Sequence, residues 1–188
     1  LDTRVKKRRK SDSNWFARSA DSAHTVGMRV RYDGQDKFKP DILALIAPHV
    51  RLLPLCPESM AGMGIPRAPV NLIQRNGAIE AVGRDDPGRN VSARLHTMGR
   101  IVGRTYPELC GYIVQSRSPS CGAATTPVYN SDQTQVIHTK GNGLFVAALL
   151  AAQPDLPILD DQNLEPGPID RFLTAVNQRA RLLANNSV

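Results

Sequence analysis

The sequence predicts an α/β fold in which a mostly parallel sheet is flanked by helices, in a Rossmann-like three-layer sandwich. Two observations lead to this prediction. Short strand-like runs alternate with amphipathic stretches along the chain, and this alternation requires crossover connections between parallel strands. The two clearest strands, 50–55 and 110–114, are mostly apolar, as expected of strands buried on both faces.

In the first half of the chain, apolar spacing predicts a short helix, a buried strand and a hairpin. In chain order they cover residues 40–48, 50–55, and 70–74 with 78–82. Pro40 suits the first turn of the helix. Asn76-Gly77, between the last two strands, is the strongest short hairpin signal in the chain. Residues 59–69 hold several Gly and Pro turn signals and are expected to form a loop.

In the second half, three helices and two strands follow from the same patterns. The helices cover 91–106, 143–153 and 168–184, and the strands cover 110–114 and 157–159. Asn90 stands where a helix cap is expected. The last helix repeats apolar residues at helical spacing. A chain of 188 residues suits one domain.

The positive charge is concentrated at one end of the chain. Residues 1–20 hold seven basic and two acidic residues, which supplies most of the net charge of +7. We predict a disordered basic tail over residues 1–21 and a single domain over 22–188. We do not expect the domain to bind nucleic acid. Only the tail could do so, because the cluster Lys6–Lys10 could contact phosphates.

Compartment and membrane association can be judged from composition. The longest apolar run, 144–152, is far shorter than a membrane span. Cys56, Cys110 and Cys121 are the three cysteines of the chain, and this odd, sparse count argues against a disulfide framework. We therefore expect a cytoplasmic protein without a membrane partner.

Two strand ends carry residues that could support chemistry, because ligands of parallel sheets bind at the carboxyl ends of strands. Cys56-Pro57-Glu58 ends the strand 50–55. Its thiol could bind a soft metal and its carboxylate could act as a base, or the pair could be a structural cysteine and a surface glutamate. The loop Ser118–Gly122 follows the strand 110–114, after Arg117, which could meet an anion. Gly141–Gly143 opens a helix, and capping suits it better than anion binding.

Five motifs follow one another in a specific order. They are Arg31-Tyr32-Asp33-Gly34, Cys56-Pro57-Glu58, Pro66-Arg67-Ala68-Pro69, Ser116–Gly122 and Gly141-Asn142-Gly143. Together they resemble the bacterial thiouracil desulfidase family over about residues 22–159. The resemblance implies an enzyme that removes sulfur from a thiolated nucleobase by non-redox hydrolysis. It also implies a 4Fe–4S cluster held by three cysteines, with one iron open to the substrate sulfur.

The resemblance assigns a role to each motif residue. By position, Glu58 would be the acid/base that activates water, and Ser118 its hydroxyl partner. The residues that would bind the small thiolated substrate are Arg31, Asp33, Arg67, Arg117 and Ser120. Cys56 and Cys121 would be two of the cluster ligands. A homodimer is compatible with this reading.

One cluster ligand of the family is replaced in this chain. The aligned run is Ser22–Gly27, in which His24 stands at the position of the first cysteine. Imidazole can bind iron, so we expect the metal ligands Cys56, Cys121 and His24, with a more labile cluster. The alternative is a cluster-free pseudoenzyme, or a protein of the same fold that binds a small molecule or a nucleotide. Cys110 begins its strand and cannot supply the missing ligand.

Overall fold

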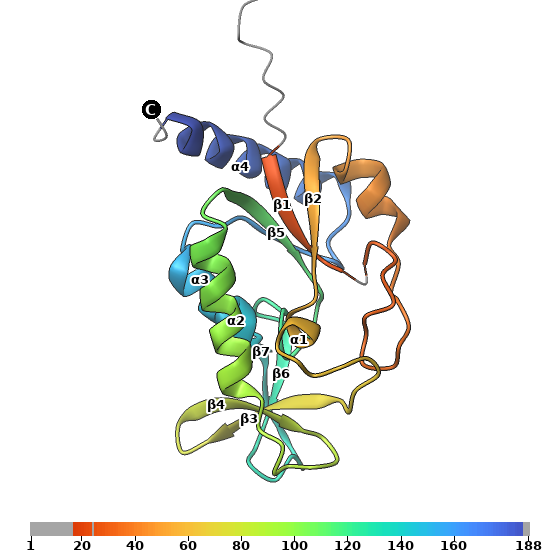
Figure 1. The fold of residues 1–188 in the computed structure, drawn as a ribbon, viewed down its shortest axis with the longest axis vertical. Helices are drawn as coiled ribbons and strands as arrows, with labels where there is room; N and C mark the ends of the chain where they lie inside the picture. The colour runs from red at the N-terminus through yellow and green to blue at the C-terminus, as the bar shows by residue number, and fades with distance from the viewer. Residues whose placement is uncertain (1–16, 24, 186–188) are drawn as a thin grey trace, which may run out of the picture.

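The structure, a computed structural model, describes residues 17–23 and 25–185. One sheet consists of four parallel strands in the order β2-β1-β5-β8, of which Figure 1 labels β2, β1 and β5. These strands are β1 (Ala17–Ser22), β2 (Val50–Leu55), β5 (Leu109–Val114) and β8 (Ile158–Asp160). The predicted α/β class is therefore confirmed. The strands β2, β5 and β8 lie within about a residue of the ranges expected from the sequence.

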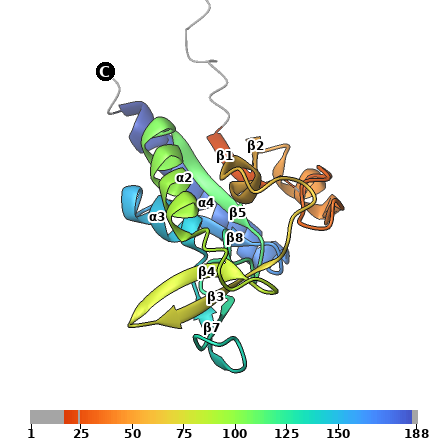
Figure 2. The same ribbon diagram turned by 60° about the horizontal axis from the view of Figure 1, so that its bottom comes forward.

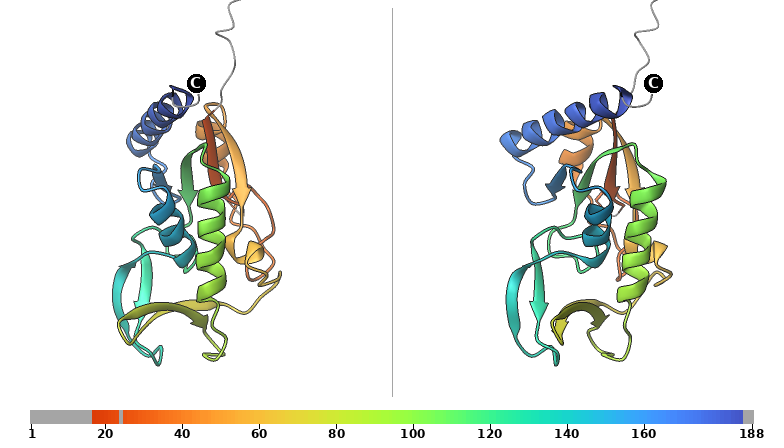
Figure 3. Two further views of the ribbon diagram at one scale, coloured as in Figure 1. Left: turned by 60° about the vertical axis from the view of Figure 1, so that its left-hand side comes forward. Right: turned by 90° about the vertical axis from the view of Figure 1, so that its left-hand side faces the viewer.

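The parallel sheet is covered on both faces, as a three-layer sandwich requires. The helices are α1 (Pro57–Met60), α2 (Ser92–Thr105), α3 (Leu144–Ala152) and α4 (Pro166–Asn185), and a π-helical turn η1 covers Ile42–Ile46. On one face, Phe145 of α3 packs against Tyr112 of β5. On the other face, Phe172 of α4 and Ile42 of η1 pack around Ile113. Figure 3 shows α2 and α3 side by side and α4 across the top of the sheet.

A second sheet has the strand order β4-β3-β6-β7. Its strands are β3 (Val70–Arg75), β4 (Ala78–Gly83), β6 (Thr126–Tyr129) and β7 (Val136–Gly141). β3 is parallel to β6, and the two hairpins are antiparallel. The predicted hairpin is β3–β4, and both Asn76 (φ 51°) and Gly77 (φ 78°) have the positive φ that a tight two-residue turn needs. Figure 2 shows this sheet below the parallel one.

The boundary predicted for the basic tail is wrong at its carboxyl end. Residues 17–21 belong to β1, which is hydrogen-bonded between β2 and β5 at the centre of the parallel sheet. Ser19 and Ala20 are fully buried there. A central strand made of small and polar residues has no apolar pattern, so the sequence did not reveal it. Residues 1–16 lie outside the described residues, and the extent of the domain stays a prediction.

No helix within residues 17–23 and 25–185 is long and apolar enough to cross a membrane. The carboxyl ends of β2 and β5 point toward the second sheet (Figure 1). The loops that follow these two strands therefore meet residues of β3 and β6. This junction between the two sheets holds the candidate site.

Candidate functional site

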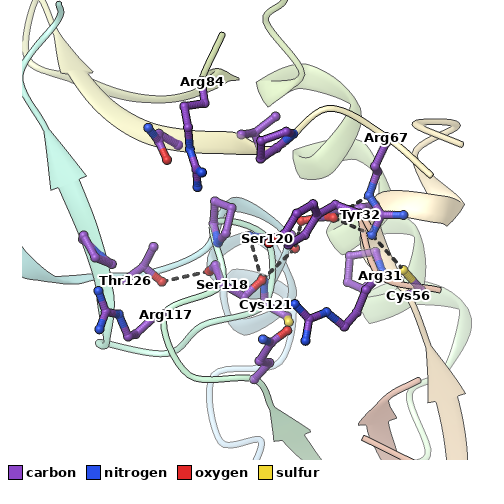
Figure 4. Close-up of a pocket in the computed structure, with 18 of the residues that line it drawn as sticks. Arg31, Tyr32, Cys56, Arg67, Arg84, Arg117, Ser118, Ser120, Cys121 and Thr126 are labelled. Atoms are coloured by element: carbon purple, nitrogen blue, oxygen red, sulfur yellow. Dashed lines mark hydrogen bonds and ion pairs between the residues drawn. The ribbon is translucent and has the colours of Figure 1, made fainter. Parts of the chain in front are cut away.

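A cavity of about 270 Å³ lies between the two sheets. Its walls come from the loop after β1, the ends of β2 and β5, and the second sheet. The lining residues used below are Arg31, Tyr32, Cys56, Glu58, Arg67, Arg84, Arg117, Ser118, Ser120 and Cys121. Figure 4 shows that Arg84 and Arg31 reach into the cavity from opposite sides. Four of the five motifs named from the sequence thus contribute to one cavity, whereas Gly141-Asn142-Gly143 does not line it.

Cys56 and Glu58 are placed by the turn from β2 into α1. Cys56 caps α1, and Pro57 takes the first helical position, where its missing N–H costs nothing. The Cys56 sulfur is half-buried, and it lies 3.2 Å from the Ser59 hydroxyl and 3.5 Å from the Val30 carbonyl oxygen. Ser59 was not predicted as a site residue. Its spacing of three from Cys56 within a helical turn is the signal that could have found it.

The Glu58 carboxylate accepts hydrogen bonds on both oxygens. Arg67 Nε donates to Oε2 at 2.6 Å, and Ser120 Oγ donates to Oε1 at 2.9 Å. The Glu58 side chain is 14% exposed, so it is held firmly but still reaches the cavity. Because each carboxylate oxygen has two acceptor positions, Oε1 keeps one position for a further donor.

Ser118, Ser120 and Glu58 form a hydrogen-bonded chain with one direction. The hydroxyl oxygens of Ser118 and Ser120 are 3.0 Å apart. Ser120 has a single hydroxyl proton and donates it to Glu58, so Ser118 must donate to Ser120. The Ser118 oxygen also accepts the backbone N–H groups of Ser120 and Cys121, at 3.3 and 3.2 Å. The chain therefore runs Ser118 to Ser120 to Glu58.

The loop that holds these serines is packed tightly against the start of α3. The N–H groups of Leu144 and Phe145 donate to the carbonyls of Pro119 and Ser120, at 3.0 and 3.1 Å. These helical N–H groups are thus capped by the loop, as the sequence favoured for Gly141–Gly143. A Cβ on Gly143 would come within 2.4 Å of the Ser120 carbonyl carbon, so only glycine allows this contact.

Two aspartates lie at the end of β8, and the second of them contacts the start of the same loop. Asp161 is fully buried, and its Oδ1 accepts the N–H of Ser116 at 2.8 Å. Its Oδ2 lies 3.8 Å from Lys37 Nζ. Asp160 accepts the N–H of Gln162 at 2.9 Å. Burial raises the pKa of Asp160, and the neighbouring Asp161 carboxylate adds to this rise.

Four arginines and one acidic residue, Glu58, line the cavity. Arg31 pairs with Asp33 at 3.1 Å and stacks on the ring of Tyr32, and Asp33 itself is not part of the cavity wall. Arg67 pairs with Glu58. Among the described residues, neither Arg84 nor Arg117 has a carboxylate partner. Arg84 was not predicted, because it follows the β3–β4 hairpin and joins the site only through the second sheet.

Two cysteines of the cavity, Cys56 and Cys121, have the chemistry of iron–sulfur cluster ligands. Cys56 and Cys121 line the same cavity, and thiolates are the ligands that iron–sulfur clusters use. Cys110 cannot join them, because it lies at the opposite end of β5 and its sulfur contacts the Glu108 carbonyl at 3.3 Å. His24, the third predicted ligand, lies outside the described residues. Within the described part of the chain, no three His, Cys, Asp or Glu side chains are grouped to hold a metal.

Comparison with known proteins gives a family and a fold. The 2-thiouracil desulfurase family model matches residues 22–161. A solved structure of a 4Fe–4S-dependent thiouracil desulfidase, TudS, is similar with a TM-score of 0.60 and 24% sequence identity, covering 78% of this chain and 92% of that chain. This likeness shows the fold. The comparison with curated proteins found no match.

Proposed function

This chain belongs to the 2-thiouracil desulfurase family, and we propose that it removes sulfur from a thiolated pyrimidine by hydrolysis without net redox change. One observation carries the proposal. The Glu58 carboxylate opens into the cavity that Cys56 and Cys121 line, and Ser120 and Arg67 fix its orientation. A soft-metal position and a proton acceptor are therefore brought together in one small cavity.

The protein's own groups account for the movement of the proton. Oε2 of Glu58 is contacted by both Nε and Nη2 of Arg67. Among the described residues, Oε1 accepts a side-chain hydrogen bond only from the Ser120 hydroxyl. A water molecule can therefore donate to Oε1, which takes its proton while the water oxygen attacks the carbon that bears the sulfur. The second proton of the water passes to the departing sulfur, the carbon–sulfur bond breaks, hydrosulfide (HS⁻) leaves, and the oxygen remains as a carbonyl. Ser118, through Ser120, holds Oε1 in place.

A 4Fe–4S cluster held by Cys56, Cys121 and His24 is part of the proposal. When bound, a soft iron with an open position would take up sulfur and make it a better leaving group. The presence of three unbridged thiols suits a reducing cytoplasm. TudS is a 4Fe–4S-dependent enzyme, which supports the presence of a cluster, whereas the choice of ligands rests on the positions of the motifs.

The charge of the cavity narrows the substrate class. Four arginines and one glutamate line the cavity, so its wall carries an excess of positive charge. Arg84 and Arg117 have no carboxylate partner among the described residues. Guanidinium groups suit phosphate and carboxylate oxygens. We therefore propose that the substrate is a thiolated pyrimidine with an anionic group, such as a nucleoside monophosphate.

The experiment is anaerobic reconstitution with iron and sulfide, followed by assay of sulfide release from thiouracil and from thiouridine monophosphate. We expect visible absorbance with about four irons per chain, and turnover that Glu58→Gln lowers by roughly 10²–10⁴-fold without loss of iron. Ser131→Ala, in an exposed turn, is the matched control. Full cluster loading without turnover of any thio-substrate would contradict the proposal. Iron that binds only in the variant His24→Cys would indicate a relative that has lost the cluster.

A further inference from the structure

Arg67 connects three sequence motifs. Its backbone N–H donates to the Tyr32 carbonyl at 2.8 Å, and its side chain reaches the segment that holds Cys56 and Glu58. The side chain is only 3% exposed, although it lines the cavity. A cationic group buried to this degree requires protein partners for its polar atoms.

Every nitrogen of the Arg67 guanidinium has such a partner. Nε donates to Oε2 of Glu58 at 2.6 Å, and Nη2 lies 2.5 Å from the same oxygen. Nη1 donates to the Gly64 carbonyl at 2.9 Å and lies 3.5 Å from the Ser59 hydroxyl. Nη2 also lies 3.7 Å from the Cys56 sulfur. A guanidinium has five N–H donors in one plane, and these five contacts account for them.

We infer that Arg67 is a positioning residue that acts through Glu58 and Cys56, and that it does not bind the substrate. This inference revises the role expected from the sequence and rests on the proposed function for its effect on turnover. Two N–H groups on Oε2 prevent the Glu58 carboxylate from rotating, so Oε1 stays directed at Ser120 and the cavity. The same rigid plane sets the position of the carboxylate relative to the Cys56 sulfur.

The chain offers a matched control for this role. Arg179 on α4 donates from Nε to the Leu109 carbonyl at 2.8 Å and from Nη2 to Gln153 at 2.9 Å. It is therefore a hydrogen-bonded arginine outside the cavity wall. Arg67→Lys is the conservative variant, because an ammonium keeps the charge but cannot reproduce the planar fork.

The experiment measures the variants Arg67→Gln, Arg67→Lys, Glu58→Gln, the double variant of Arg67→Gln with Glu58→Gln, and Arg179→Gln. In reconstituted protein, we expect Arg67→Gln to lower kcat about 100-fold, as loss of a supporting residue does, and to change KM less than about threefold. Arg67→Lys should recover only part of kcat. In the Glu58→Gln background, Arg67→Gln should cause a much smaller further loss of kcat, and Arg179→Gln should leave kcat unchanged.

A second readout does not depend on turnover. The midpoint of urea unfolding should fall in Arg67→Gln, and should fall by a smaller amount when Glu58→Gln is already present, because the interaction shared by the two residues is then lost already. Arg179→Gln should lower the midpoint equally in both backgrounds. A raised KM with unchanged kcat, or additive effects of Arg67→Gln and Glu58→Gln, would overturn the inference. If wild-type protein turns over no thio-substrate, the proposed function fails, and the unfolding cycle alone decides whether Arg67 holds Glu58.

Discussion

The hydroxyl of Ser120 donates to Oε1 of Glu58 at 2.9 Å, although the two residues are 62 positions apart in the chain. One residue follows β2 and the other follows β5, on either side of the central strand β1. The parallel arrangement of these strands therefore creates the contact. It also explains why a carboxylate beside one cysteine and a hydroxyl beside another meet in one cavity.

Removing the Ser120 hydroxyl should uncouple Glu58 from the loop. In Ser120→Ala, Oε1 loses the donor that orients it, and we expect kcat to fall by about ten- to a hundredfold with iron content unchanged. Sulfide release by the reconstituted protein measures the effect. Ser131→Ala provides the control because Ser131 is exposed in a turn of the second sheet. An unchanged kcat in Ser120→Ala would show that Glu58 is oriented without this bond.

A methyl group at Gly143 should displace the loop that carries Ser120 and Cys121. The Cβ would come within 2.4 Å of the Ser120 carbonyl carbon and 2.7 Å of the Cys121 nitrogen. Since φ at Gly143 is an ordinary −60°, the effect is steric, and Gly143→Ala should cost about 1–3 kcal/mol of unfolding free energy. Gly167→Ala, with its nearest neighbour atom at 3.5 Å, should cost nothing. Equal urea midpoints for the two variants would refute this explanation.

The parts of the fold that the sequence revealed are those with their own local pattern. β2 begins and ends where the mostly apolar run from Val50 to Leu55 does, and the turn at Asn76-Gly77 marks the β3–β4 hairpin. The sequence does not predict β1, because its small and polar residues show no apolar pattern. Small side chains are enough to fill the space at this buried strand between β2 and β5. β7 was missed because five of its six residues are exposed, so no alternation between buried and exposed positions marks it.

The site divides in the same way. Cys56, Glu58, Ser118 and Cys121 could be predicted because each belongs to a short motif with a recognisable order. Arg84 could not be predicted, because it reaches the cavity through the second sheet. The strands β6 and β7 of that sheet have no pattern in the sequence that predicts them. Hydrogen-bond partners cannot be read from the sequence. The motif therefore predicts substrate binding for Arg67, and only the structure reveals that its side-chain nitrogens contact Glu58, Gly64, Ser59 and Cys56.

The buried Asp161 should contribute to stability mainly as an acceptor for the loop. Asp161→Ala leaves the N–H of Ser116 without the acceptor it has at 2.8 Å, and should cost about 1–3 kcal/mol of unfolding free energy. Asp161→Asn keeps an oxygen at that position and should cost less. Urea unfolding of both variants tests the difference. Equal losses would mean that the ion pair with Lys37, rather than the Ser116 contact, determines the contribution of Asp161.

Asp160 should make the stability fall as the pH rises. Burial and the neighbouring Asp161 charge raise its pKa in the folded protein above the ordinary 3.8, so the folded state binds more protons than the unfolded chain in that range. The stability that Asp160 contributes is therefore present below pH 3.8 and is lost as the pH rises through its folded pKa. Asp160→Asn should remove this component. Urea unfolding from pH 4 to 7 measures it, and parallel curves for wild type and variant would contradict the prediction.

Arg84 should discriminate between charged and uncharged substrates. It lines the cavity and has no carboxylate partner among the described residues, so its charge is available for an anion. We expect Arg84→Gln to raise KM for thiouridine monophosphate by about ten- to a hundredfold, the value of one charge-assisted hydrogen bond, with kcat little changed. For uncharged thiouracil, KM should stay the same. Arg100→Gln controls for the change in net charge, because Arg100 is an exposed arginine on α2 that donates a hydrogen bond to Thr97 and lies outside the cavity wall. If Arg84→Gln weakens both substrates equally, Arg84 contacts the base rather than the anionic group. If it weakens neither, the anion binds elsewhere in the cavity.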